Sequence, residues 1–379
     1  MTSLRAAYAA QSSPTAAQLQ AWERFNQLGL PGFRDEQWKY TQLHRLYSQS
    51  FTDLKSSSSI TTIEGLSIKR INTPNHIVND PFVALNHALN AEELLIEVAD
   101  NTEINQPLEL RFAASGEAPT INAPRVTLKL GRNSKLTLVE HSRSVDATAH
   151  LNLSVITISL AENAHLQHCC LQDENRGSFH ICNVDVDVSE QARYINHQFN
   201  LGGSLSRTDI NIKLNGAQSY AELNGLQFAV GNQVLDTHSR VEHCVPHARS
   251  SETYHGIADD RGQVVFNGKV MVHKHAIGTD AQQSSRNLLL SPKAEIDTKP
   301  ELEIYADDVK CSHGATVGQL DNTALFYLRS RGIGEQEARA LLTLAFADAI
   351  INKLPLAPLR ETLTQQVHAR FNTNKELAL

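Results

Sequence analysis

The chain has 379 residues, 41% hydrophobic and 20% charged, so it is long enough for a core larger than that of one small domain. Its formal net charge of −7 argues against the basic surface that nucleic-acid binding requires, so we expect no nucleic-acid partner. No apolar run approaches the roughly 20 residues that cross a bilayer, and no signal-peptide pattern opens the chain, so we expect no membrane contact. The five cysteines are scattered without a C-x-x-C pair, which favours a reducing, cytoplasmic location.

The first 90 residues are predicted to form an N-terminal domain (1–90) of helical and mixed structure. Apolar residues recur at helical spacing from Leu19 to Leu28, and glycine and proline then interrupt the pattern. The segment that follows, Arg-Asp-Glu-Gln-Trp-Lys-Tyr-Thr at 34–41, leads into a second short helix. We interpret Trp22 and Trp38 as core anchors and predict no chemistry in this domain.

Residues 91–318 form the predicted core, because short alternating apolar segments there are separated by turn residues at a nearly fixed period. A small residue marks the turn of each unit, and successive markers are 30, 28 and 27 residues apart: Ser134, Ala164, Ala192 and Ser219. A period near 28 residues without intervening helices is typical of the coil of a β-helix, whose inward residues we expect to stack into apolar ladders. An antiparallel sandwich is the competing geometry.

Histidines and cysteines cluster twice in this core, around His165–Cys170 and from His238 to His275. Cys169 and Cys170 are adjacent, so on a strand they face opposite sides and do not share a site easily. Neither cluster has a recognisable ligand motif, and we interpret them as polar strand residues and buried thiols. Nucleotide-binding, nucleophile-elbow and zinc-protease motifs are absent from the sequence. The aspartate pairs at 259–260 and 307–308 leave a carbohydrate-active β-helix enzyme as an alternative, because such enzymes use paired carboxylates.

The stretch 310–318 ends the core and contains Cys311 and His313, which on a strand would point to the same face. Both side chains suit iron or zinc chemistry, but a C-x-H pair is weak evidence by itself. After Gln319 the periodicity becomes helical and predicts a C-terminal helical domain (319–379) with a wide apolar stripe. That stripe either packs on the core or docks a partner.

Three segments together resemble the SUF family of iron–sulfur cluster assembly proteins. They are 29–41, which contains RDEQWKYT; 308–318, DVKCSHGATVG; and 325–333, LFYLRSRGI. The resemblance implies a mainly β fold: a right-handed parallel β-helix core flanked by N- and C-terminal helical domains. It also implies a cytoplasmic complex with two partners, the paralogue SufB and the ATPase SufC, and a homodimer is possible when SufB is absent.

Within such a complex the resemblance implies a non-catalytic scaffold that pairs with SufB through the β-helix. SufC would dock on the C-terminal helices, and the residues expected to bind it are Leu325, Phe326, Tyr327, Arg329, Arg331, Leu341 and Phe346. His313 and Cys311 are the candidate metal ligands, at the SufB interface, for a transient iron–sulfur cluster shared with SufB. We expect no cofactor bound tightly by this chain alone.

The chain departs from SufB at two of its motifs. Ser285 stands where SufB carries a cysteine, and Gly314 is one of two positions that have lost a glutamate. A serine hydroxyl is a far poorer iron ligand or sulfur acceptor than a thiolate, so this chain should not build a cluster alone. The alternative from another class is a stand-alone β-helix metalloenzyme or carbohydrate-active enzyme.

Overall fold

The computed structural model describes residues 2–9, 11, 13–32, 34–51, 53–55, 58–72, 78–114, 119–145 and 148–372. Strands dominate it and form two sheets, sheet A with 11 strands and sheet B with 9. Sheet A contains β1 (Asp53–Lys55), β3 (Leu66–Asn72), β4 (Glu92–Val98), β6 (Thr120–Asn122), β7 (Arg125–Leu130), β9 (His150–Leu160), β11 (Phe179–Val188), β13 (Leu205–Leu214), β15 (Val234–His243), β17 (Gln263–Val272) and β19 (Glu295–Ile304). Sheet B contains β2 (Ser59–Ile60), β5 (Leu108–Ala114), β8 (Lys135–Ser144), β10 (His165–Asp173), β12 (Arg193–Asn200), β14 (Tyr220–Ala229), β16 (Arg249–Ala258), β18 (Asp280–Leu289) and β20 (Lys310–Gly318).

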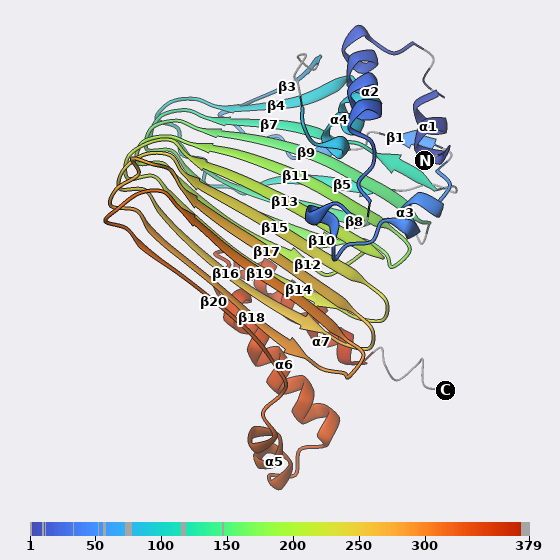
Figure 1. Ribbon diagram of the computed structural model, residues 1–379, viewed down its shortest axis with the longest axis vertical. Helices are drawn as coiled ribbons and strands as arrows, with labels where there is room; N and C mark the ends of the chain where they lie inside the picture. The colour runs from blue at the N-terminus through green and yellow to red at the C-terminus, as the bar shows by residue number, and fades with distance from the viewer. Residues whose placement is uncertain are drawn as a thin grey trace.

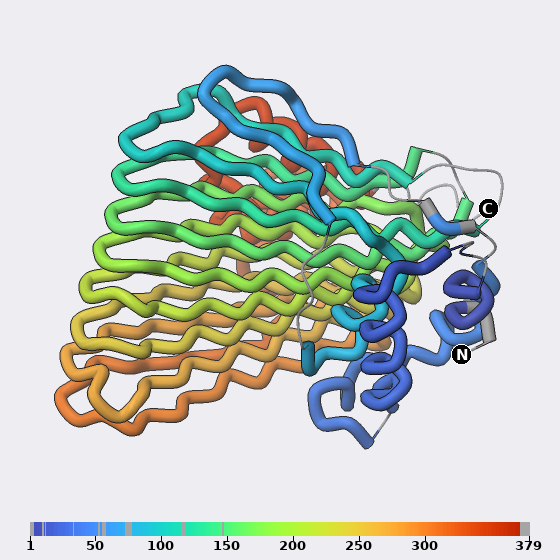
Figure 2. The backbone as a smooth tube through the Cα atoms, turned by 90° about the horizontal axis from the view of Figure 1, so that it is seen from above, coloured from blue at the N-terminus to red at the C-terminus, as the bar shows by residue number. Residues whose placement is uncertain are grey.

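The two sheets are the walls of a β-solenoid. From β7 onward successive strands alternate between the sheets, and each strand pairs in parallel with the strand of the same sheet in the next coil. About eight coils stack in this way. Figure 2 shows the coils as successive rungs of the backbone trace. The coiled architecture predicted from the period is therefore confirmed, and the parallel ladders exclude the antiparallel sandwich.

One turn recurs where each coil passes from sheet A to sheet B. A residue with positive φ occupies it in every coil: Asn101, Asn133, Asn163, Gln191, Gln218, His247, Gly278 and Asp308. Asparagine tolerates this left-handed conformation, and its side chain also links coils, because Asn133 Nδ2 donates to Asn101 Oδ1 at 2.8 Å. The small residue after the turn is fully buried at all four predicted markers.

The interior of the solenoid is only partly apolar, so the expected apolar ladders are confirmed for one part of each coil and are absent from another part of the described strands. Leucine, isoleucine and valine fill the part nearest the recurrent turn. Farther along the strands of sheet B the inward positions are polar and buried, including Glu140, His168, Gln198, Glu252 and Gln283. Neighbouring coils supply hydrogen-bond partners to many of these groups, as in the pairs His168–Glu140 and Gln283–Glu252, and such bonds offset the cost of burying polar atoms.

The two ends of the solenoid differ. At the N-terminal end β3 pairs antiparallel with β4, and β2 pairs antiparallel with β5, so additional strands cover the first coil. At the C-terminal end β19 and β20 are the last strands of their sheets, each with one neighbour. An uncovered edge of this kind presents unpaired backbone N–H and C=O groups to any incoming strand.

N-terminal helices lie on the outer face of sheet A (Figure 1). They are α1 (Thr2–Ala9), α2 (Ala16–Leu28), the short 3-10 helix η1 (Glu36–Trp38), α3 (His44–Ser48) and α4 (Pro81–Leu89). The buried ring of Trp38 packs beneath the Arg207 guanidinium at 4.1 Å, and Arg207 donates to the Gln37 carbonyl. This confirms Trp38 as a core anchor, whereas Trp22 is half-buried and stacks on Tyr8.

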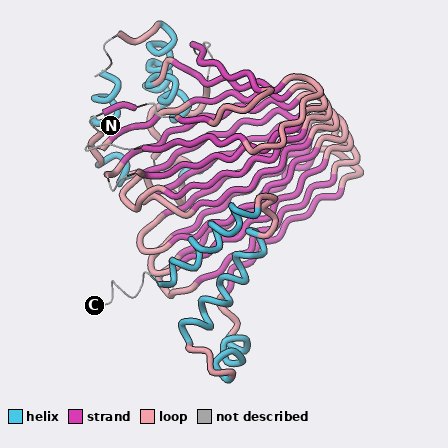
Figure 3. Tube along the Cα trace, turned by 180° about the vertical axis from the view of Figure 1, so that it is seen from behind, coloured by secondary structure: helices cyan, strands magenta, loops and turns pink. Residues whose placement is uncertain are grey.

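C-terminal helices α5 (Asn322–Ser330), α6 (Glu335–Ile351) and α7 (Ala357–Asn372) follow the last strand. Helices α6 and α7 lie across the outer face of sheet B (Figure 3), where Ile350, Leu354, Leu363 and others pack against residues of β10 to β16. Helix α5 has no buried residue and projects away from the solenoid (Figure 1). None of the described helices is both long and apolar enough to cross a bilayer.

Candidate functional site on the edge strand

Strand β20 carries Cys311 and His313 on the open C-terminal edge of sheet B. In the ladder with β18, Cys311 lies opposite Ala281 and His313 opposite Gln283, which are both buried inward-facing positions. Because parallel coils stack in register, Cys311 and His313 continue the same inward columns. His313 is nevertheless exposed, since no further coil covers it.

Beneath His313 the column consists of polar groups that the sequence reasoning missed. Gln283 Nε2 donates to Glu252 Oε1 at 3.3 Å, and Ser239 Oγ donates to Glu252 Oε2 at 2.5 Å. Burial raises the pKa of Glu252 to about 7, although both hydrogen bonds oppose that rise. The acceptor Gln283 Oε1 is buried without a hydrogen-bond partner in the described structure. The sequence offers no signal for this column, because residues 249–255 of β16 (RSSETYH) are polar at both inward and outward positions.

Cys311 is half-buried and lies against the small apolar cluster that contains Val270, Val272 and Ala281. Burial raises the pKa of its thiol, so the thiol stays protonated near neutral pH. A bound metal ion would reverse that preference, because the thiolate is the ligating form. Cys311 and His313 are two donors, fewer than the four ligands that usually hold an iron–sulfur cluster.

Ser285 is fully inside the solenoid, one coil away from β20. It lies opposite Ala315 in the ladder, and its hydroxyl accepts from Asn287 Nδ2 at 2.9 Å and from Thr298 Oγ1 at 3.1 Å. Its position is therefore diagonal to His313 rather than beside it. Gly314 is open, with no atom within 4 Å of where a side chain would begin.

The residues predicted to bind SufC divide into an exposed and a packed group. On α5, Phe326 is 75% exposed and Tyr327 57% exposed, while the Arg331 guanidinium lies 5.2 Å from the Tyr327 ring. Phe346 of α6 instead stacks on the ring of His255 at 4.4 Å and packs with the apolar cluster against sheet B. The remaining members divide by exposure as follows: Leu325 is half-buried, and Arg329, Arg331 and Leu341 are exposed.

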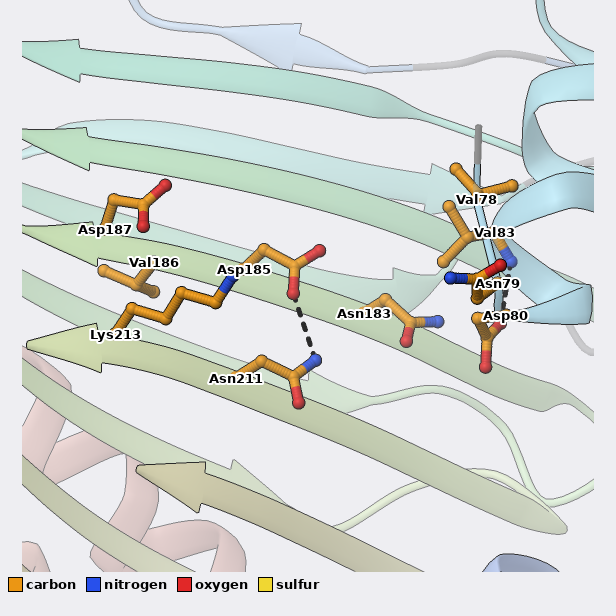
Figure 4. A pocket seen from close by; sticks show the side chains of 10 residues that line it. All are labelled: Val78, Asn79, Asp80, Val83, Asn183, Asp185, Val186, Asp187, Asn211 and Lys213. Atoms are coloured by element: carbon orange, nitrogen blue, oxygen red, sulfur yellow. Dashed lines mark hydrogen bonds between the residues drawn. The ribbon is translucent and has the colours of Figure 1, made fainter. Parts of the chain in front are cut away.

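A groove on the outer face of sheet A lies apart from this edge (Figure 4). It encloses about 450 Å³ between the start of α4 and strands β11 and β13, and its lining includes Asp80, Asp185, Asp187 and Lys213. Asp80 caps α4, accepting from the backbone N–H of Phe82, and Asp185 accepts from Asn211 Nδ2 at 3.0 Å. None of the predicted site residues lines this groove.

The remaining carboxylate pairs occupy turns. Asp260 and Asp308, one residue of each pair, have positive φ and occupy turns, which gives them a structural role.

Comparison with known proteins identifies the class. A family model described as "SUF system FeS cluster assembly, SufBD core domain" matches residues 112–346. The chain is 36% identical to the iron–sulfur cluster assembly protein SufD of Escherichia coli, over 93% of this chain and 92% of that protein. It is 38% identical to a SufBD family protein of Synechocystis, over 77% of this chain and 66% of that protein, and 32% identical to the chloroplastic protein ABCI7 of Arabidopsis thaliana, over 76% and 62%. The chain belongs to the SufBD family of iron–sulfur cluster assembly proteins, and within it to the SufD subunits.

Proposed function

We propose that this chain is a non-catalytic scaffold subunit of a cytoplasmic complex with SufB and SufC. In the proposal it pairs with SufB through the open edge formed by β19 and β20, and it lends His313 and Cys311 to a nascent iron–sulfur cluster there. The observation that supports the pairing most is the difference between the two ends: the antiparallel strands β3 and β2, of 7 and 2 residues, follow the first coil, whereas the last parallel coil itself forms the edge with β19 and β20, of 10 and 9 residues. The same edge would join two copies when SufB is absent.

The backbone of β20 suits the addition of a strand. Lys310 N–H donates to the Thr279 carbonyl, toward β18. Because backbone groups of successive residues point to opposite sides of a strand, the N–H groups of Cys311, His313 and Ala315 point away from β18. These groups are free to bond a partner strand, as in other complexes that extend a sheet by its edge.

Substitution of Ala315 with proline tests the pairing. Proline removes one outward N–H but is tolerated on an edge strand whose N–H faces solvent. We expect Ala315→Pro to fold alone and to lose co-purification with co-expressed SufB, whereas the control Ala315→Val keeps it. A proline variant that still co-purifies with SufB in normal yield would contradict edge pairing.

The ligand role of His313 is tested in the intact complex. Because His313 faces the interior column and Ser312 the opposite face, His313→Ala should abolish cluster assembly in cells, while the neighbouring Ser312→Ala should preserve it. Complex stoichiometry, measured by native mass spectrometry, must be the same in both variants. Normal cluster assembly in a His313→Ala complex would refute the ligand role.

For SufC the proposed docking surface is α5, supported by the exposure of Phe326 and Tyr327 and the absence of buried residues on that helix. We expect Phe326→Ala to weaken SufC binding, since buried aromatic anchors dominate many interfaces. The matched control is Phe346→Leu, whose ring packs within the chain and whose loss should change stability more than SufC affinity. Isothermal titration with purified SufC separates the two, and equal affinity of Phe326→Ala and wild type would exclude α5 as the dock.

We further infer that the chain is organised as domains 1–90, 91–318 and 319–379, and that the solenoid is right-handed. The strong right-handed preference of crossovers between parallel strands supports the handedness. Limited proteolysis should then cut near residues 318–321 before it cuts within the coils, and early cleavage between coils would argue against these boundaries.

A further inference from the structure

A second set of metal-ligand side chains lies inside the solenoid, away from the edge strand. Glu140 of β8 and His168 and Cys170 of β10 all face inward and are at most 5% exposed. In the ladder Cys170 lies directly opposite Glu140, and His168 lies two residues earlier on the same face as Cys170. Three different ligand types therefore meet on two neighbouring coils.

We propose that Glu140, His168 and Cys170 form a buried site for one divalent transition-metal ion of the zinc and ferrous class. The side-chain atoms already converge: His168 Nε2 is 3.2 Å from Glu140 Oε2 and 3.1 Å from Cys170 Sγ, and Sγ is 3.9 Å from Oε2. The inference concerns this chain alone and does not depend on pairing with SufB.

These spacings are close to the edges of a coordination tetrahedron. With usual zinc bonds of about 2.0–2.1 Å to nitrogen and oxygen and about 2.3 Å to sulfur, tetrahedral ligand atoms are about 3.4–3.6 Å apart. The three observed distances lie on both sides of that range, so side-chain adjustments of about half an ångström or less would admit an ion. Thiolate, imidazole and carboxylate together select a borderline-soft ion rather than Mg²⁺ or Ca²⁺.

The surroundings of the trio resemble the outer shell of a metal site. His168 Nδ1 lies 3.0 Å from the Tyr194 hydroxyl, a bond that would fix the ring with Nε2 toward the ion. The Asn196 amide is also close, with Nδ2 3.5 Å from Cys170 Sγ, while its buried Oδ1 has no hydrogen-bond partner in the described structure. Rotation of that amide would present Oδ1 as a fourth ligand, since O and N are assigned from the hydrogen-bond network.

An ion would also resolve an electrostatic cost. The trio holds a buried carboxylate oxygen, Glu140 Oε2, 3.9 Å from the buried Cys170 sulfur, and the anionic forms of these two groups would repel one another in a low-dielectric interior. A divalent cation stabilises both anions together and deprotonates the thiol. The competing explanation is a simple His168–Glu140 ion pair with an inert thiol.

The chain supplies an internal control. Glu242, Cys244 and His273 form a second Glu–Cys–His trio, but this one lies half-buried at a coil corner. There Cys244 Sγ contacts the Glu242 backbone carbonyl, and the Glu242 carboxylate is already paired with Arg240 and His273. We expect this trio to hold no ion.

The test uses full-length chain expressed in media supplemented with zinc, iron or cobalt, followed by metal analysis. We expect about one equivalent of metal, with Co²⁺ giving a thiolate-to-cobalt charge-transfer band. Cys170→Ser should lose the band and most of the metal, while Cys244→Ser should keep both. Circular dichroism checks the fold, and Tyr194→Phe provides a milder variant that should weaken the metal affinity by about 10–100-fold.

Three results would overturn the proposal. They are a folded wild type without metal from all three cultures, equal metal content in Cys170→Ser and wild type, and loss of metal in Cys244→Ser alone. The first would leave the His168–Glu140 ion pair as the explanation of the cluster.

Discussion

Replacing Glu252 with glutamine should change how the stability of the chain depends on pH. The carboxyl is 2% exposed and its pKa is raised to about 7 by burial, compared with 4.5 for an unhindered glutamate. The folded state therefore retains a proton that the unfolded state releases above about pH 4.5. The free energy of unfolding is therefore unaffected by this group below about pH 4.5. It falls as the pH rises from 4.5 to about 7 and then no longer changes with pH because of Glu252.

The magnitude follows from the difference between the two pKa values. At about 1.4 kcal/mol for each tenfold change in the equilibrium constant, the burial of Glu252 costs about 3 kcal/mol above pH 7. Glutamine is neutral at every pH and similar in shape, and its amide can donate to the unpartnered Gln283 Oε1. Between about pH 5 and pH 8, the free energy of unfolding of Glu252→Gln should rise relative to wild type by about 2–3 kcal/mol.

Urea unfolding of both proteins across that pH range measures the difference directly. A companion variant, Ser239→Ala, removes a hydrogen bond that lowers the pKa of Glu252. It should move the decline of the wild-type curve to higher pH, whereas Glu252→Gln should remove the decline. A difference between Glu252→Gln and wild type that stays flat with pH, or falls as pH rises, would refute the reasoning.

Three further predictions concern the fold and are measured by urea unfolding. Gly225→Ala should lower the free energy of unfolding by about 1–3 kcal/mol, because a Cβ there would lie 2.1 Å from the buried Tyr254 ring. Gly314→Ala on the open edge should lower it far less, and equal losses in the two variants would contradict this reasoning. Arg207→Met should cost about 3–5 kcal/mol, since it leaves two buried or half-buried carboxylates without their cation, and a neutral result would be inconsistent with that ion network. Leu354→Ala should cost about 2–5 kcal/mol by opening a cavity beneath α6 and α7, and no loss would mean that these helices are not docked on sheet B.

Much of the solenoid could be predicted from the sequence because its determinants are local and repeat. Small residues after the turn, such as Ala164 and Ala192, must fit against the next coil, so their spacing reveals the period. The strand alternation is similarly local. The position of Cys311 and His313 at the end of the solenoid could also be predicted from the sequence, because both residues come at the end of the last repeat.

The parts that the sequence did not predict depend on contacts between distant residues. Arg207 contacts the Gln37 carbonyl across 170 positions, and nothing in the pattern around either residue indicates that pairing. The polar interior was missed for the same reason, because a polar residue facing inward is favourable only when a neighbouring coil supplies its partner. Glu140 and Cys170 are 30 residues apart and become neighbours only when the coils stack in register.

Hydrogen exchange at the backbone of β20 tests the central claim most directly. In the isolated monomeric chain, the outward amides of Cys311, His313, Ala315 and Val317 should exchange freely, since they have no partner strand. In a complex with SufB, edge pairing predicts strong protection of these amides, with little change in the amides that already bond β18. If the complex forms and the exchange of the outward amides stays as fast as in the free chain, SufB does not pair with this edge.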